Sequence, residues 1–215
     1  MPISLISLTF NAFQENTYIA FCSDTKEAVI VDPGVSSPAE EAELQNALAR
    51  IGASPTAVWL THAHIDHVIG LRWACEHYRI PFYHSEADVA TLRSVPVYAP
   101  MYGVHHFALP DEPGITIGHG DTVSVGQARF EVRFAPGHAP GHLVFYNQTL
   151  GVIAGDCLFA GSIGRTDLPG GDFDVLERSI REQLYTLPDE TQVYPGHGPA
   201  TTIGREKKFN PFVRV

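Results

Sequence analysis

Four side chains of metal-ligand type occur within six residues of this sequence, directly after a short apolar run. The run Val58-Trp59-Leu60 predicts the end of a buried strand. The segment that follows it contains His62, His64, Asp66 and His67. In α/β folds, binding residues gather in the loops where strands end. Because histidine is the commonest metal ligand among side chains, this segment predicts a metal site at one end of a sheet.

Three later segments share one pattern, in which an apolar strand is followed by glycine and then by histidine or aspartate. They are Pro136-Gly137-His138, Gly155-Asp156 and Pro195-Gly196-His197. Glycine beside a ligand leaves room for the backbone to approach a metal ion. Burying this many imidazoles and carboxylates without partners would cost several kcal/mol per group. We therefore expect the three segments to meet the first cluster at one site.

The candidate ligands are numerous enough for two metal ions. One ion with an open coordination position needs only three protein ligands, so two ions that share a carboxylate use three each plus the shared one. All candidate donors are nitrogen or oxygen atoms, which suits zinc and also iron or manganese. We expect two divalent metal ions, zinc in the first place, bound by His62, His64, Asp66, His67, His138, Asp156 and His197.

The composition is that of an ordinary globular protein, with 44% hydrophobic and 18% charged residues. Its formal net charge of −10 disfavours nucleic acid, whose phosphates require a basic surface. The sequence has no apolar run near the roughly 20 residues of a membrane span and no secretory pattern at its start. Three widely spaced cysteines fit a reducing compartment. We expect a cytoplasmic protein without nucleic-acid or membrane partners, either a monomer or a small homo-oligomer.

Strand and helix patterns alternate along the chain in two similar halves. Strands are predicted over 3–9, 16–21, 27–31, 56–60, 81–84, within 114–135 and 142–155, and over 192–194, and helices over 37–50, 67–77, 85–93 and 174–184. The segment from Val95 to Pro113 contains four prolines and predicts a long irregular loop. This pattern favours a single α/β domain over residues 1–215, with sheets inside and helices outside.

The whole ligand set resembles that of the metallo-β-lactamase fold superfamily, and the resemblance covers nearly the entire chain. It implies a four-layer αββα sandwich with a dinuclear metal site at one edge. It also implies that His62, His64 and His138 hold one metal ion, that Asp66, His67 and His197 hold the other, and that Asp156 bridges them.

Within that superfamily, three segments resemble the short bacterial glyoxalase II-like hydrolases. They are 137–142, 161–167 and the tail from 195–199 to Asn210-Pro211-Phe212. The resemblance implies hydrolysis of a small-molecule thioester, S-lactoylglutathione, by a metal-activated hydroxide, with Asp66, His62 and His64 as catalytic residues. Ala139 stands where the family usually has threonine. Because the segment after His197 is short, we expect no separate C-terminal helical domain for glutathione.

Substrate binding is predicted for Arg165, Tyr102 and Lys207. Arg165 lies in a glycine-rich loop and could pair with a substrate carboxylate. Two alternatives share the same residues. A persulfide dioxygenase-like enzyme with a single iron has the same histidine segment and a loop like Gly164-Arg165-Thr166-Asp167. A hydrolase of another ester, a lactone or a lactam would differ mainly in its pocket loops.

Overall fold

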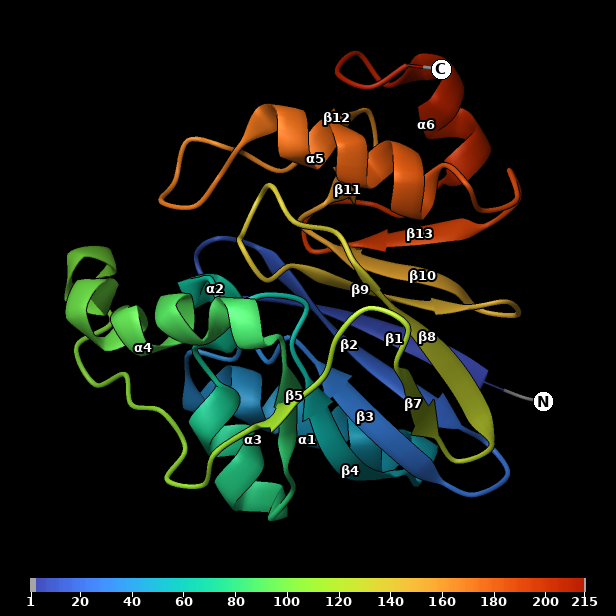
Figure 1. Cartoon of the computed structure of the whole chain (residues 1–215). Helices are drawn as coiled ribbons and strands as arrows, with labels where there is room; N and C mark the ends of the chain where they lie inside the picture. The colour runs from blue at the N-terminus through green and yellow to red at the C-terminus, as the bar shows by residue number, and fades with distance from the viewer. Residues whose placement is uncertain (1–2, 215) are drawn as a thin grey trace.

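Two six-stranded sheets pack face to face, with helices on both outer sides (Figure 1). The computed structural model describes residues 3–214. The first sheet contains, in order, β1 (Ile3–Phe10), β2 (Glu15–Cys22), β3 (Glu27–Val31), β4 (Ser54–Trp59), β5 (Phe82–His84) and β6 (Ile115–Thr116). The second has the order β14 (Thr201–Thr202), β13 (Gln192–Pro195), β10 (Gly151–Gly155), β9 (Leu143–Asn147), β8 (Ala128–Phe134) and β7 (Thr122–Val125). A short pair, β11 (Leu158–Phe159) and β12 (Ser162–Ile163), forms a two-stranded sheet of its own beside β13.

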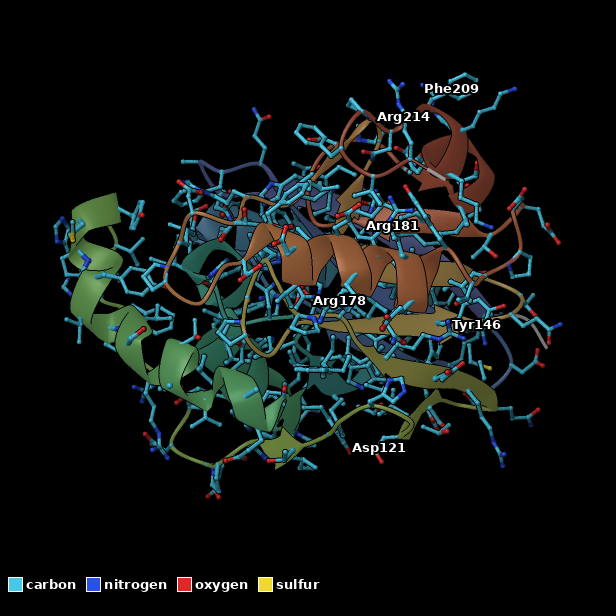
Figure 2. All side chains as sticks on the ribbon, turned by 45° about the horizontal axis from the view of Figure 1, so that its top comes forward. Asp121, Tyr146, Arg178, Arg181, Phe209 and Arg214 are labelled. Atoms are coloured by element: carbon cyan, nitrogen blue, oxygen red, sulfur yellow. The ribbon has the colours of Figure 1, made fainter. Side chains whose placement is uncertain are left out.

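The helices form the outer layers of the sandwich. They are α1 (Pro38–Ile51), α2 (Ile65–Val68), α3 (Leu71–Tyr78), α4 (Val89–Tyr98), α5 (Phe173–Ser179) and α6 (Ile203–Phe209), with shorter helical turns at Glu86–Asp88, Ala99–Tyr102 and Ile180–Leu184. Figure 1 shows α5 and α6 on the side of the second sheet and α1 and α3 on the opposite side. In Figure 2, Arg178 and Arg181 lie on the exposed side of the α5 segment. The predicted αββα sandwich is confirmed.

Alternating side chains divide the apolar residues into three layers. In β3, Val29 and Val31 face the second sheet, whereas Ala28 and Ile30 face the helices outside the first sheet. Trp59 lies between the sheets, with its ring centre 5.2 Å from that of Phe130. Since the central strands are buried on both faces, their sequences are continuously apolar rather than alternating. This packing fixes the strands whose ends carry the candidate ligands.

Two helices begin with ordinary N-capping hydrogen bonds. The Ser37 hydroxyl accepts a hydrogen bond from the backbone N–H of Glu40, 3.3 Å away, at the start of α1. The Asp172 carboxylate accepts one from the backbone N–H of Val175, 3.0 Å away, and so caps α5. Each cap satisfies a backbone donor that the first turn of a helix otherwise leaves without a partner.

The predicted irregular loop from Val95 to Pro113 is wrong over its first part. The helix α4 continues through Pro96 to Tyr98, and a 3₁₀ turn follows over Ala99–Tyr102. Leu92, Val95 and Ala99 are buried at helical spacing against the first core, and this burial outweighs the hydrogen bond that proline removes. None of the helices within residues 3–214 is long and apolar enough to cross a membrane.

Sheet topology brings the ends of four strands to one edge of the sandwich. β8 and β10 are both antiparallel to β9, and β10 is parallel to β13, so these three strands point the same way. The backbone N–H of Leu143 donates to the carbonyl of Thr61 over 2.7 Å, which joins the end of β4 to the second sheet. The predicted ligand segments follow β4, β8, β10 and β13 and therefore share this edge.

Candidate metal centre

The seven candidate ligands come together as two trios with a shared aspartate. His62, His64 and His138 offer nitrogen atoms that all lie within 4.8 Å of one another. The Nε2 of His138 lies 3.2 Å from the Nε2 of His62 and 2.8 Å from the Nδ1 of His64. Three imidazole nitrogens converging at this range leave room for one cation among them.

The second trio contains Asp66, His67 and His197, whose donor atoms also lie within 4.8 Å of one another. The Nε2 of His197 lies 3.1 Å from Oδ2 of Asp66, and the Nε2 of His67 lies 3.5 Å from the same oxygen. His64 occupies the position just before the short helix α2, which contains Asp66 and His67. The turn from loop into helix therefore aims the first half of the segment at one trio and the second half at the other.

Asp156 lies between the two trios. Its Oδ2 is 3.4 Å from the Nε2 of His138 in the first trio and 3.5 Å from that of His197 in the second. Its Oδ1 is 3.4 Å from the Nε2 of His67. One carboxylate thus touches ligand atoms of both trios, which is the arrangement expected of a bridging residue.

Two buried atoms at the centre of the cluster have no hydrogen-bond partner. They are Nε2 of His67 and Oδ1 of Asp156. A buried polar atom without a partner costs about 1–3 kcal/mol, more when the group is charged. Both atoms point at each other across the cluster, and a cation between them would satisfy both. The donor set of imidazoles and carboxylates therefore fits bound metal ions.

Burial and neighbouring charges shift the pKa values of the histidines in opposite directions. Burial lowers the pKa of His62, and burial with neighbouring His138 lowers the pKa of His64 to about 3. These rings are neutral at physiological pH and can each donate a lone pair to a metal ion. Burial opposes protonation of His197, but hydrogen bonds to Asp156 and Asp66 outweigh it and raise the pKa of that ring to about 9. Metal binding at the second trio therefore replaces a proton with the ion.

Two glycines next to candidate ligands, Gly196 and Gly137, are needed for different structural reasons. A Cβ on Gly196 would lie 2.1 Å from Oδ1 of Asp156, so this position leaves the space that the shared aspartate needs. A Cβ on Gly137 would instead strike the backbone of Leu176 in α5, and the residue adopts φ +123°. Only the first glycine makes room at the ligands themselves, whereas the second lets α5 approach the loop of His138.

Asp32, which the motif analysis does not select, supports both the loop and a ligand. Its Oδ1 accepts a hydrogen bond from the backbone N–H of Thr61 at 2.7 Å. Its Oδ2 accepts one from the Thr61 hydroxyl at 2.6 Å and lies 3.1 Å from the Nδ1 of His67. A carboxylate behind a histidine ligand fixes the ring's orientation and tautomer. The signal was present in the sequence, since Asp32 also directly follows an apolar strand.

Asp88 joins two ligand loops from behind. Its Oδ2 accepts a hydrogen bond from the backbone N–H of Ala63 at 2.7 Å, and its Oδ1 accepts one from the backbone N–H of Gly141 at 2.9 Å. The side chain is buried, and burial raises its pKa although these hydrogen bonds oppose the shift. His142 adds a third support, because its Nε2 accepts the backbone N–H of Asp156 at 3.0 Å. No pattern near Asp88 in the sequence indicated this role.

A cavity of about 940 Å³ opens beside the cluster and exposes only part of it. Its walls include Asp66, His64, His138, Asp156 and His197, and also Phe13, Ile65, Ala90, Thr91, Ser94, Tyr98, Met101, Tyr102, Phe159, Ile163, Arg165, Leu168 and Pro169. Tyr102 and Arg165, for which substrate binding was predicted, line this cavity. Lys207 does not line it; its ammonium group donates to the Leu187 carbonyl at 3.3 Å and to Asp189 at 2.6 Å.

Comparison with known families agrees with this geometry. The family described as the Metallo-beta-lactamase superfamily matches residues 11–197, a range that contains every one of the seven candidate ligands. The chain belongs to the Metallo-beta-lactamase superfamily. Metal ions are therefore part of its chemistry, and the clustered histidines and aspartates are the residues suited to hold them.

Three relatives show what this superfamily protein is similar to. It is 36% identical to the hydroxyacylglutathione hydrolase GloC of Haemophilus influenzae, over 99% of this chain and 98% of that one. The structure of TTHA1623 in a di-iron-bound form matches with a TM-score of 0.85 and 36% identity, over 97% of this chain and 100% of that one. The BLEG-1 B3 metallo-beta-lactamase matches with a TM-score of 0.83 and 35% identity, over 98% and 99%.

Proposed function

We propose that this protein is a metal-dependent hydrolase that splits a small-molecule thioester into a carboxylate and a thiol. The observation that carries the proposal is Asp156, which lies between two trios of ligands beside a substrate-sized cavity. The likeness to a hydroxyacylglutathione hydrolase over nearly the full chain supports a thioester as the bond that is cleaved. S-lactoylglutathione is accordingly the reference substrate.

The proposal includes two divalent metal ions, zinc in the first place. His62, His64 and His138 would hold one, Asp66, His67 and His197 the other, and Asp156 would contact both. Such ions lower the pKa of a bound water toward about 7 and polarise a carbonyl group, and that is the chemistry they would supply here. The di-iron form of TTHA1623 supports a pair of ions in this arrangement.

Asp66 is the residue best placed to direct the attacking water. Its side chain lines the cavity and is 13% exposed, whereas the ring of His67 is fully buried. A carboxylate there accepts a hydrogen bond from the water and aims it at the thioester carbonyl carbon. His62 and His64 act by holding a metal ion in position.

The cavity wall also favours a good leaving group. Among the described residues that line it, the only carboxylates are Asp66 and Asp156, and both belong to the metal cluster. A thiol with a pKa of about 8.5 leaves as a thiolate without a strong acid to protonate it. Attack on the carbonyl carbon breaks the C–S bond, and the sulfur keeps the bonding electrons. Thioesters therefore suit this site better than substrates with a poor leaving group.

Metal analysis combined with turnover tests the proposal. The purified protein should contain two metal ions per chain and hydrolyse S-lactoylglutathione, and a chelator should remove both properties together. Asp66→Ala should lose most of the turnover, while Asp111→Ala, at a side chain 86% exposed, should keep it. Near-normal turnover of the Asp66 variant with full metal content would refute the role of Asp66.

Hydrolysis of a β-lactam is the second candidate, because of the match to BLEG-1 over 98% of this chain. The same metal-loaded protein should therefore be assayed with a β-lactam and with glutathione persulfide. A higher kcat/KM for the β-lactam would replace the thioester proposal. A single iron per chain with oxygen uptake on the persulfide would instead indicate the dioxygenase alternative.

A further inference from the structure

The cavity beside the metal cluster is walled mainly by uncharged side chains. One wall is aromatic, with the rings of Phe13 and Tyr102 in edge contact at 5.6 Å and those of Tyr98 and Tyr102 at 6.1 Å. The facing segment contributes Phe159, Ile163 and Leu168. A substrate binds more tightly to such walls with each of its apolar groups that they remove from water.

The one arginine or lysine among the described wall residues is already paired. Arg165 donates through Nε and Nη2 to the two oxygens of Asp167, both at 2.7 Å. This is the bidentate geometry that arginine would use for a substrate carboxylate. The pair has no net charge, and the guanidinium edge formed by Nε and Nη2 is occupied by Asp167.

A glutathione thioester presents the wrong charges to such a cavity. It has two carboxylates and one ammonium group, so it is an anion at neutral pH. The chain itself has a formal net charge of −10 before any metal ion is counted, which disfavours the approach of anions at low ionic strength. Lys207, the other cation expected to help, lies on α6, which contributes no residue to the cavity wall, and pairs with Asp189.

We propose that this site selects uncharged thioesters with a bulky apolar acyl group, such as hexanoyl or phenylacetyl, over glutathione thioesters. This inference rests on the proposed thioester hydrolysis and names its substrate class. The acyl group packs between the aromatic wall and the segment of Phe159 and Leu168, with its carbonyl toward the metal cluster. The thiol portion carries no charge that the neutral Arg165–Asp167 pair must balance.

The test compares two matched thioester series on the metal-loaded full-length protein. N-acetylcysteamine thioesters are uncharged and have an alkyl thiol like that of glutathione, so leaving-group chemistry is similar in both series. Lengthening the acyl chain from acetyl to hexanoyl should raise kcat/KM by about fourfold per methylene that becomes buried. At equal acyl group, the uncharged thioester should exceed the glutathione thioester by about tenfold.

Three variants test which residues cause the dependence on acyl length and the preference for uncharged thioesters. Tyr102→Ser, at a half-exposed wall residue, should flatten the dependence on acyl length. Val97→Ser is its matched control, because Val97 lies on the same α4 helix, is 82% exposed and does not line the cavity. Asp167→Asn releases Arg165 and should raise the ratio of glutathione thioester to uncharged thioester turnover.

The outcomes separate this inference from the function on which it rests. Hydrolysis of none of the thioesters by a protein with its full metal content would overturn both. Hydrolysis with no dependence on acyl length, or with the glutathione thioester preferred, would overturn only the substrate class. An unchanged ratio in Asp167→Asn would show that the Arg165–Asp167 pair does not exclude glutathione.

Discussion

Oδ2 of Asp32 lies 3.1 Å from Nδ1 of His67, on the far side of the ring from the metal cluster. The contact leaves Nε2 of the same ring facing Asp66 and Asp156 at 3.5 and 3.4 Å. Among the candidate ligands that the structure describes, Asp32 hydrogen-bonds only to His67. Its other hydrogen bonds come from the backbone N–H and the hydroxyl of Thr61. It therefore acts on the site by positioning a ligand.

Asp32→Ala should weaken metal binding at the second trio by about 10- to 100-fold, which is the usual cost of removing a partner behind a histidine ligand. The measurement is a competition titration with a chromophoric chelator. Asp24→Ala removes an exposed aspartate and serves as the control. Equal affinities in the two variants would show that His67 does not depend on Asp32 for its orientation.

Gly196→Ala should displace the shared aspartate. The added Cβ would lie 2.1 Å from Oδ1 of Asp156 and 2.7 Å from Cε1 of His67, so one of these side chains must move. We expect fewer than two metal ions per chain by elemental analysis. Gly118→Ala is the matched control, because a Cβ there meets nothing within 4 Å. A full metal complement in Gly196→Ala would contradict the close approach of the loop to Asp156.

Asp88→Ala should destabilise the fold as well as the first trio. It leaves the backbone N–H groups of Ala63 and Gly141 without acceptors, at about 1–3 kcal/mol each when they are buried. The melting temperature should fall by at least about 5 °C for a chain of this size. Asp88→Asn keeps one acceptor and should lose less, and Glu86→Ala, two positions away and exposed, should change little.

Glu40 gives stability that depends on pH. Burial opposes its ionisation, but the backbone N–H and hydroxyl of Ser36 and the backbone N–H of Asn11 hydrogen-bond to the carboxylate and lower its pKa. Because the pKa is lower in the folded state, this stabilisation is present above the unfolded pKa and disappears as pH falls through the folded pKa.

Glu40→Gln should accordingly lower the melting temperature by about 2 °C at neutral pH, given solvent screening of a partly exposed group. The difference from the parent protein should shrink as pH falls below the ordinary carboxyl pKa and through the lowered pKa of Glu40. Glu43→Gln, on the exposed side of the same helix, is the control and should show no such convergence. A constant difference at all pH values would exclude the charge as its source.

Local sequence was enough to predict the candidate ligands, because each follows an apolar strand within a few residues, and glycine directly precedes His138, Asp156 and His197. The division of the ligands into two trios and the four-layer sandwich followed only from the resemblance to a known superfamily. The supports behind the ligands were not predictable in this way. Asp32 reaches Thr61 across 29 positions, and Asp88 reaches Gly141 across 53.

Only the tertiary structure determines which side chains surround a residue, and those surroundings limit what the residue can do. Burial of Leu92, Val95 and Ala99 keeps α4 helical through Pro96, against the preference of the local sequence. The fold places Lys207 on α6, which contributes no residue to the cavity wall. Candidate metal-binding residues can be predicted from short segments because metal binding needs specific donor atoms. Side-chain availability depends on packing and pairing between distant segments, and only the folded chain brings those segments together.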